Sequence, residues 1–147
     1  MSPYTGDVAW VNDSGNIYKN DNRLGYDVKE YKLAAYTGDV VWLNDTGSLY
    51  KNDSRLGYDV TSYSVAEYTG DIVWINASGS LYKNENRLGY NVKEYKMAAY
   101  SGDIAWLDDS GYLYKNDRRV TSSAASFQMD EYGKMIWVDS SGVPHAA

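Results

Sequence analysis

The sequence contains no cysteine, only two prolines and a single histidine, His145. Without cysteine no disulfide can form, so the stability of the fold has to come from packing alone. No apolar run approaches the roughly 18 residues that a membrane-spanning helix needs. The N-terminal stretch, MSPYTGD, has neither the basic segment nor the apolar core of a signal peptide. The sequence therefore predicts a soluble protein without a membrane span, and it leaves the compartment open.

Runs of lysine or arginine are also missing, and the formal net charge is −6. The repeated lysines are matched by nearby aspartate and glutamate. A nucleic-acid-binding protein needs a basic surface to neutralise phosphates. The sequence therefore predicts that nucleic acid is not a partner.

What the sequence does contain is a repeat of 32 residues. The segments 36–67 and 68–99 are identical at 20 of 32 positions. A tyrosine opens each copy, at Tyr4, Tyr36, Tyr68, Tyr100 and Tyr132. Each copy is expected to be one supersecondary unit that shares its core with its neighbours. We interpret residues 1–147 as a single repeat domain of units 4–35, 36–67, 68–99, 100–131 and the partial unit 132–147.

Each unit begins with the pattern of a tight hairpin. Residues 39–44 form a short run that is apolar on both faces, which is typical of a strand covered on both sides. Asn44-Asp45-Thr46-Gly47 follows and fits a type I turn whose last residue has positive φ. The return strand is predicted over residues 48–52. The five tryptophans lie in the first of these strands and are expected to be core residues: Trp10, Trp42, Trp74, Trp106 and Trp137.

The second half of each unit is more ambiguous. Residues 52–57 are rich in turn formers, and residues 58–68 then run on without glycine or proline. Tyrosine and valine at every second or third position favour strand over helix. Since the chain must enter every unit in the same direction, an even number of strands per unit is expected. We therefore expect the long segment to break into two strands around Lys29-Glu30 and its equivalents.

Four short strands in each of about five units predict an all-β fold, a small five-bladed β-propeller. Gly47-Ser48-Leu49-Tyr50-Lys51 and Gly79-Ser80-Leu81-Tyr82-Lys83 resemble the G-x-L-Y-K phrases of tachylectin-type five-bladed propeller lectins. That resemblance implies closed blades and carbohydrate binding. However, five hairpins are present with only four connecting segments, and Pro144 in the last unit belongs at a sheet edge. An open β-repeat array, or solenoid, remains the alternative.

One polar set follows the hairpin in the first three units: Lys-Asn-(Asp/Glu)-x-Arg-Leu-Gly-Tyr. Planar amides, a bidentate guanidinium and an aromatic face suit sugar hydroxyls or a carboxylated sugar. The structural alternative is a salt-bridged loop in which Arg23 pairs with Asp21 or Asp27. The ligand-binding residues predicted from this set are Asn20, Arg23, Tyr26, Asn52, Arg55, Tyr58, Asn84, Arg87 and Tyr90.

Two other polar features are expected to be structural. The Asn-Asp-(Ser/Thr)-Gly turns offer too few oxygens for calcium, so no metal site and no cofactor are predicted. The Asp of each Tyr-(Thr/Ser)-Gly-Asp corner is expected to fix that corner by hydrogen bonds. These residues are Asp7, Asp39, Asp71 and Asp103.

Catalysis is disfavoured because the only histidine lies near the C-terminus and no nucleophile motif is present. Catalysis also needs one asymmetric constellation, whereas these polar residues recur in equivalent places. The sequence predicts a non-enzymatic, multivalent carbohydrate-binding protein with glycans as partners. Two alternatives stay open. One is a structural subunit that self-assembles through its incomplete last unit, as in a filament, surface layer or virion. The other is a designed symmetric repeat protein without a ligand.

Overall fold

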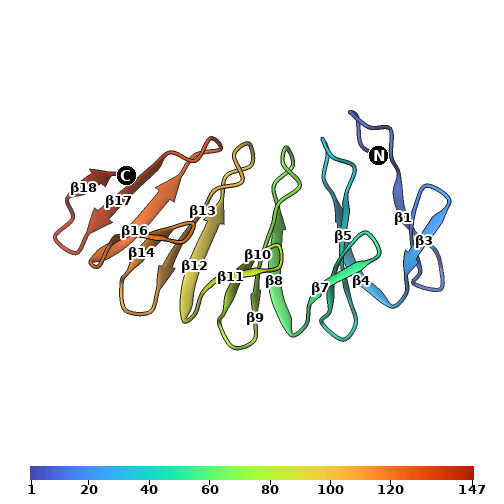
Figure 1. The fold of residues 1–147 in the computed structure, drawn as a ribbon, viewed down its shortest axis with the longest axis horizontal. Coiled ribbons are helices and arrows are strands. Elements are labelled where there is room, and N and C mark those ends of the chain that lie inside the picture. Colours follow the sequence, from blue (N-terminus) through green and yellow to red (C-terminus); the bar gives the residue numbers. More distant parts are fainter.

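The computed structural model describes residues 1–147 and contains eighteen strands and no helix. The strands form five antiparallel sheets stacked in chain order, a propeller-like repeat array (Figure 1). The prediction of an all-β fold of tandem repeats is therefore confirmed. Sheet 1 comprises β1 (Ala9–Val11), β2 (Ile17–Lys19) and β3 (Asn22–Gly25). Sheet 5 comprises β16 (Ala124–Met129), β17 (Met135–Asp139) and β18 (Pro144–Ala146).

The three middle sheets have four strands each. Sheet 2 comprises β4 (Val28–Leu33), β5 (Val40–Asn44), β6 (Leu49–Lys51) and β7 (Ser54–Gly57). Sheet 3 comprises β8 (Val60–Val65), β9 (Ile72–Asn76), β10 (Leu81–Lys83) and β11 (Asn86–Gly89). Sheet 4 comprises β12 (Val92–Met97), β13 (Ile104–Asp108), β14 (Leu113–Lys115) and β15 (Arg118–Thr121). Each of these three sheets thus takes its first strand from the end of the preceding sequence unit.

The predicted hairpin is present in each unit. In sheet 2 the Asn44 Oδ1 accepts the backbone N–H groups of Thr46 and Ser48 at 3.0 and 2.9 Å. Gly47 closes the turn with φ of 87°, a left-handed conformation that glycine adopts without strain. Cross-strand pairing then places Trp42 opposite Tyr50. Their rings stack with centroids 4.2 Å apart.

The second half of the unit divides at a different point from the one predicted. Lys29 and Glu30 lie inside β4, and residues 54–57, which the sequence pattern suggested were turn, form β7. The chain turns instead at Asn52 and at Asp59, whose φ angles are 54° and 56°. Asparagine and aspartate tolerate this left-handed conformation because their short polar side chains bond locally. The breaks between strands in this half of the unit therefore lie at these left-handed residues.

The core lies between the sheets and is not enclosed by any single one. Val40 and Trp42 of β5 pack toward sheet 1 in a cluster with Ile17. Val41 and Leu43 pack toward sheet 3 in a cluster with residues such as Ile72 and Trp74. The prediction that the apolar strand is covered on both faces is confirmed here. Trp42, Trp74 and Trp106 are buried, whereas Trp10 on the end sheet is 40% exposed.

A glycine allows each buried tryptophan to approach the preceding sheet. A Cβ built on Gly57 would lie within 3.0 Å of three atoms of the Trp74 ring. Gly25 and Gly89 face Trp42 and Trp106 in the same way. This contact explains why glycine recurs in the Arg-Leu-Gly-Tyr phrase.

A ladder of tyrosines runs across the corners that join the first and second strands. The rings of Tyr4, Tyr36, Tyr68, Tyr100 and Tyr132 stack in sequence, with centroids 3.6, 3.7, 3.7 and 5.0 Å apart. The hydroxyl groups of the first four rings form a hydrogen-bonded chain. Hydrogen bonds with Tyr100 and Tyr36 raise the pKa of Tyr68. The tyrosine that opens each unit thus links neighbouring units.

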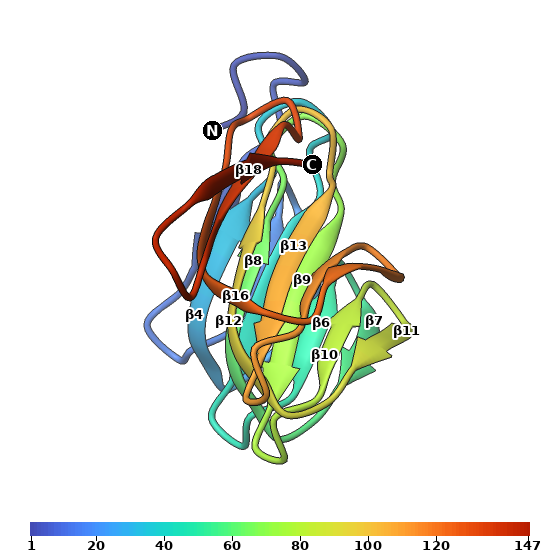
Figure 2. The same cartoon turned by 90° about the vertical axis from the view of Figure 1, so that its left-hand side faces the viewer.

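The array is open within one chain. Sheets 1 and 5 lie at opposite ends of its long axis (Figure 1). Seen along that axis, the five sheets overlap, and the outer strands β7 and β11 lie on one side (Figure 2). The first strands of neighbouring sheets touch: Lys32 Nζ donates to the carbonyl of Tyr63 at 3.3 Å, and Lys96 Nζ to that of Phe127 at 3.0 Å. The five sheets are therefore those of a propeller-like array, with the two end sheets apart.

Candidate binding grooves between the sheets

The predicted arginines and tyrosines lie together on the surface. Tyr26, Tyr58 and Tyr90 are exposed and lie two residues before the first strands of sheets 2, 3 and 4. The guanidinium carbons of Arg23, Arg55 and Arg87 lie 5.6, 5.1 and 4.6 Å from the ring centroids of these tyrosines. At these distances a cation and a ring attract each other.

The arginines have no ionic partner. No carboxylate oxygen lies within 4.0 Å of any of the three. The ion pairs of the chain involve Lys19, Lys51, Lys83 and His145 instead. The salt-bridged loop considered for Arg23 is therefore absent. The five N–H donors of each guanidinium stay available to a ligand.

The predicted asparagines have a different role. Asn52 Oδ1 accepts the backbone N–H of Val40 at 2.9 Å, and its amide donates to Asp39 Oδ1 at 3.1 Å. The backbone carbonyl oxygen of Asn52 accepts the Trp42 indole N–H at 2.8 Å. Asn20 and Asn84 make the same three bonds in their own units. With both ends of the amide occupied, these asparagines hold the hairpin to the corner and do not face a ligand.

The corner aspartates are the partners of these asparagines. Asp39 also lies 3.7 Å from Lys51 Nζ. The hydrogen bond from Asn20, followed by that from Thr5, lowers the pKa of Asp7. Burial alone would raise the pKa of Asp103, but hydrogen bonds from Asn116 and Ser101 outweigh it and lower the pKa. The corner aspartates therefore fix the corner, chiefly through a side chain from the hairpin.

Grooves between neighbouring sheets lie beside the first two Arg–Tyr pairs. The groove between sheets 1 and 2 encloses about 390 Å³ and is lined by Arg23, Leu24, Gly25, Tyr26, Asp27, Trp42, Asn44 and Tyr50. The groove between sheets 2 and 3 encloses about 240 Å³ and is lined by Leu56, Gly57, Tyr58, Asp59, Trp74, Asn76, Tyr82 and Glu85. Seven residues of the second lining lie 32 positions after residues of the first. We call these spaces the inter-sheet grooves.

The groove linings include residues that the sequence pattern did not select. Asn44 holds the hairpin turn through Oδ1, and its Nδ2 makes no hydrogen bond within the chain. Asp27 is exposed at a left-handed position beside Tyr26. The recurrence of Asp or Asn after each Leu-Gly-Tyr phrase is the signal that could have found this position. The groove between sheets 1 and 2 therefore joins amide and guanidinium donors, a carboxylate acceptor and an exposed tyrosine ring. In the groove between sheets 2 and 3, Glu85 lines the space and Arg55 does not.

The groove pattern changes along the chain. Arg87 and Tyr90 repeat the pair between sheets 3 and 4, with Asn91 following the tyrosine. In the fourth unit Ser122 replaces the tyrosine and Thr121 replaces the glycine, and Arg119 instead lies 5.2 Å from the Tyr112 ring. The chain therefore carries three equivalent Arg–Tyr pairs.

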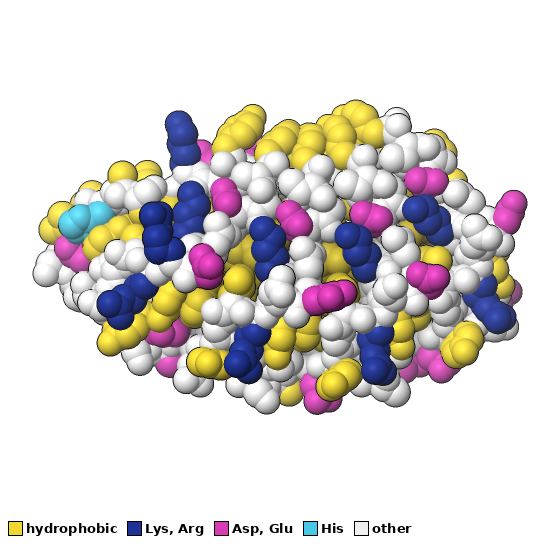
Figure 3. All heavy atoms as spheres, viewed as in Figure 1, with side chains coloured by type: hydrophobic (Ala, Val, Ile, Leu, Met, Phe, Trp, Pro, Cys, Tyr) yellow, Lys and Arg dark blue, Asp and Glu magenta, His cyan; other side chains and the backbone are white.

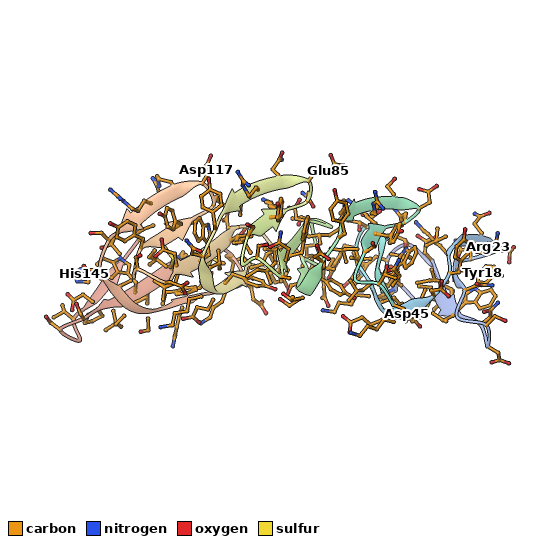
Figure 4. All side chains as sticks on the ribbon, turned by 90° about the horizontal axis from the view of Figure 1, so that it is seen from below. Tyr18, Arg23, Asp45, Glu85, Asp117 and His145 are labelled. Carbon is orange, nitrogen blue, oxygen red and sulfur yellow. The ribbon has the colours of Figure 1, made fainter.

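Charges of both signs are spread over the array. Lys and Arg side chains recur at regular spacing across one face, with acidic and hydrophobic side chains between them (Figure 3). Glu85 and Asp117, which occupy equivalent turns of neighbouring units, stand along one long edge of the array (Figure 4). No group of three or more His, Cys, Asp or Glu side chains converges as a metal site. The structure also has no helix of the length and apolarity required to cross a bilayer.

Fold and grooves together define a class, a tandem-repeat all-β protein with repeated surface grooves. No family model and no curated protein matches the sequence. Among solved structures, the crystal structure of Kluyvelomyces marxianus Hsv2 is similar, with a TM-score of 0.49 and 14% identity. The match covers 99% of this chain and 60% of that chain. A likeness this distant carries no conclusion about what this chain binds.

Proposed function

We propose that the inter-sheet grooves bind carbohydrate and that the protein is a non-enzymatic, multivalent lectin-like module. The observation that carries this proposal is the recurring Arg–Tyr pair without an ionic partner, set beside a groove in which other polar atoms are also free. Glycans are the proposed partners.

The chemistry of the groove suits a sugar. A sugar hydroxyl both donates and accepts hydrogen bonds. Within one groove, Asn44 Nδ2 and Arg23 offer donors and Asp27 offers an acceptor. The exposed ring of Tyr26 offers a flat surface for the apolar face of a pyranose. The guanidinium would also hold a carboxylated sugar by charge-assisted hydrogen bonds. The resemblance of the G-x-L-Y-K phrases to tachylectin-type repeats leads to the same expectation.

Repetition of the sites raises the avidity of the proposed binding. Small open grooves bind weakly one at a time, but linked sites can raise avidity by about 10²–10⁴ without new contacts when a ligand reaches several of them. The sheets hold the grooves at fixed spacing, so a branched or surface-bound glycan is the favoured ligand. Free monosaccharides should bind far more weakly.

The direct test is the triple variant R23A/R55A/R87A on an array of neutral and carboxylated glycans. Loss of the guanidinium should weaken each site by about tenfold or more, since a hydrogen bond to a charged group contributes about 1.5–3 kcal/mol. Retention on the array should therefore be lost while the far-ultraviolet circular dichroism stays unchanged.

The matched control is K29A/K93A/R118A, which removes three exposed cations outside the grooves and changes the net charge equally. This variant should bind like the unmodified protein. Retained binding by the arginine variant, or equal loss in both variants, would rule out the assignment of the grooves.

A further inference from the structure

The interface between neighbouring sheets is built from the same positions each time. Each sheet has a leading face, which points toward the preceding sheet, and a trailing face, which points toward the next one. On sheet 2, Val40 and Trp42 form the leading face and are 0% and 2% exposed against sheet 1. On sheet 4, Ala105 and Leu107 form the trailing face and are 0% and 2% exposed against sheet 5. The contact is apolar on both sides.

The leading face of sheet 1 presents the same residues with no sheet in front of them. Val8 and Trp10, the counterparts of Val40 and Trp42, are 36% and 40% exposed. Trp10 nonetheless has the arrangement of a buried tryptophan. Its ring stacks on Tyr18 at 4.2 Å, and its indole N–H donates to the Asn20 carbonyl at 2.8 Å. This face is therefore already ordered for an interface that the chain does not itself complete.

The trailing face of sheet 5 is the complementary half. Ile136 takes the place of Ala105, is larger and more apolar, and is 56% exposed. Beside it lies an open groove of about 630 Å³, whose lining includes Met129, Met135 and Ala147. In sheet 4 the Asn116–Asp103 hydrogen bond occupies the equivalent position. Unit five has alanine in place of the asparagine and Lys134 in place of the aspartate, so the space stays open. Five of the eight lining residues are hydrophobic, and Gln128, Asp130 and Lys134 are the polar ones.

The tyrosine ladder also ends on these two faces. Tyr4 and Tyr132, its first and last rings, are 61% and 67% exposed. The rings between them each stack on two neighbours. Exposed apolar surfaces of this kind mark interaction sites.

We propose that the trailing face of sheet 5 docks on the leading face of sheet 1 of a second copy of this chain, continuing the sheet stack head to tail. The partner follows from continuity: the two faces present the counterparts of residues that pack at the four interfaces between sheets within the chain. Sheet 1 has no first strand and sheet 5 no fourth strand, so the contact is made by the second and third strands that both sheets have. The Tyr132 ring of one copy then lies next to Tyr4 of the other. Because the two faces differ, the contact is heterologous, and each copy retains one free face after docking. This inference does not depend on carbohydrate binding.

Two single variants test the proposal by blocking one face each. Val8→Asp places a charge on the leading face and Ile136→Asp places one on the trailing face, and both residues are exposed within the single chain, so the fold should tolerate them. The unmodified chain should show a molar mass that rises with concentration in light scattering. Each variant alone should stay at the 16.5 kDa of one chain.

A mixture gives the sharpest result. Val8→Asp keeps a free trailing face and Ile136→Asp keeps a free leading face, so an equimolar mixture should form a dimer and grow no further. Ala77→Asp serves as the control, because it adds the same charge at a turn where other units already have aspartate, and it should associate like the unmodified chain. A monomeric unmodified chain at all concentrations, self-association of either single variant, or a mixture that stays monomeric would each overturn the proposal.

Discussion

At the scale of single residues, the glycine of the Arg-Leu-Gly-Tyr phrase determines how closely two sheets approach. Gly57 lies against the face of Trp74, and any side chain there would overlap the ring. The fourth unit supports this reading, since it has Thr121 at this position and the facing Trp137 is only half-buried. The glycine and the tryptophan therefore act as a pair.

Gly57→Ala should lower the free energy of unfolding by about 1–3 kcal/mol, the usual cost of overpacking a close contact. Urea denaturation followed by tryptophan fluorescence measures this loss. Trp74→Phe removes the ring atoms that the new Cβ would meet, so the double variant should lose less stability than the sum of the two single variants. Strict additivity would contradict the packing account.

The same scale shows what the sequence could reveal about the site. The arginines and tyrosines were recognisable because no local structure requires them. The structural role of the asparagines is not visible in the sequence, because Asn20 bonds to Asp7, whose position 13 residues earlier gives no sign of the contact. The sequence pattern indicates only a turn role for Asn44, although this residue also lines a groove.

At the scale of the elements, hydrogen bonds between the hairpin and the preceding corner hold each unit together. Asn116 donates to Asp103 at 3.1 Å, and the pKa of this aspartate is lowered despite burial. Its folded-state pKa lies below 3.8, the ordinary pKa of an aspartate side chain. The stabilisation is therefore present above this value and is lost as the pH falls through the folded-state pKa.

The urea midpoint should accordingly fall as the pH drops below about 4. Asp103→Asn keeps a hydrogen-bond acceptor but cannot titrate, so its midpoint should fall less steeply over this range. Asp45→Asn, at an exposed turn position, provides the control and should follow the unmodified chain. An Asp103→Asn profile as steep as that of the unmodified chain would show that this aspartate does not contribute.

The strands themselves were predictable to different degrees. The hairpin was identified because Asn44 and Gly47 specify a turn through local chemistry alone. The second break was misplaced because Asp59 adopts a left-handed conformation that aspartate favours less strongly than glycine does. Turn preference is weak at such a position, so strand packing decides the boundary.

At the scale of the whole molecule, the repeat predicts that the same interface recurs between neighbouring sheets. It does not predict how far the stack of sheets continues. Closure depends on the small rotation between neighbouring sheets, and no single residue encodes that rotation. Sheets 1 and 5 accordingly stand at opposite ends (Figure 1). The repeat does, however, place the three Arg–Tyr pairs at equivalent positions, 32 residues apart, and this equivalence is what the binding proposal requires.

The measurement that tests this central claim most directly is the binding stoichiometry, obtained by isothermal titration calorimetry. The probe is a soluble form of the glycan that the array experiment selects. The account predicts three equivalent sites per chain, and each of R23A, R55A and R87A should remove one of them. A single site, or a stoichiometry that none of these variants changes, would contradict the assignment of the repeated grooves as the binding sites.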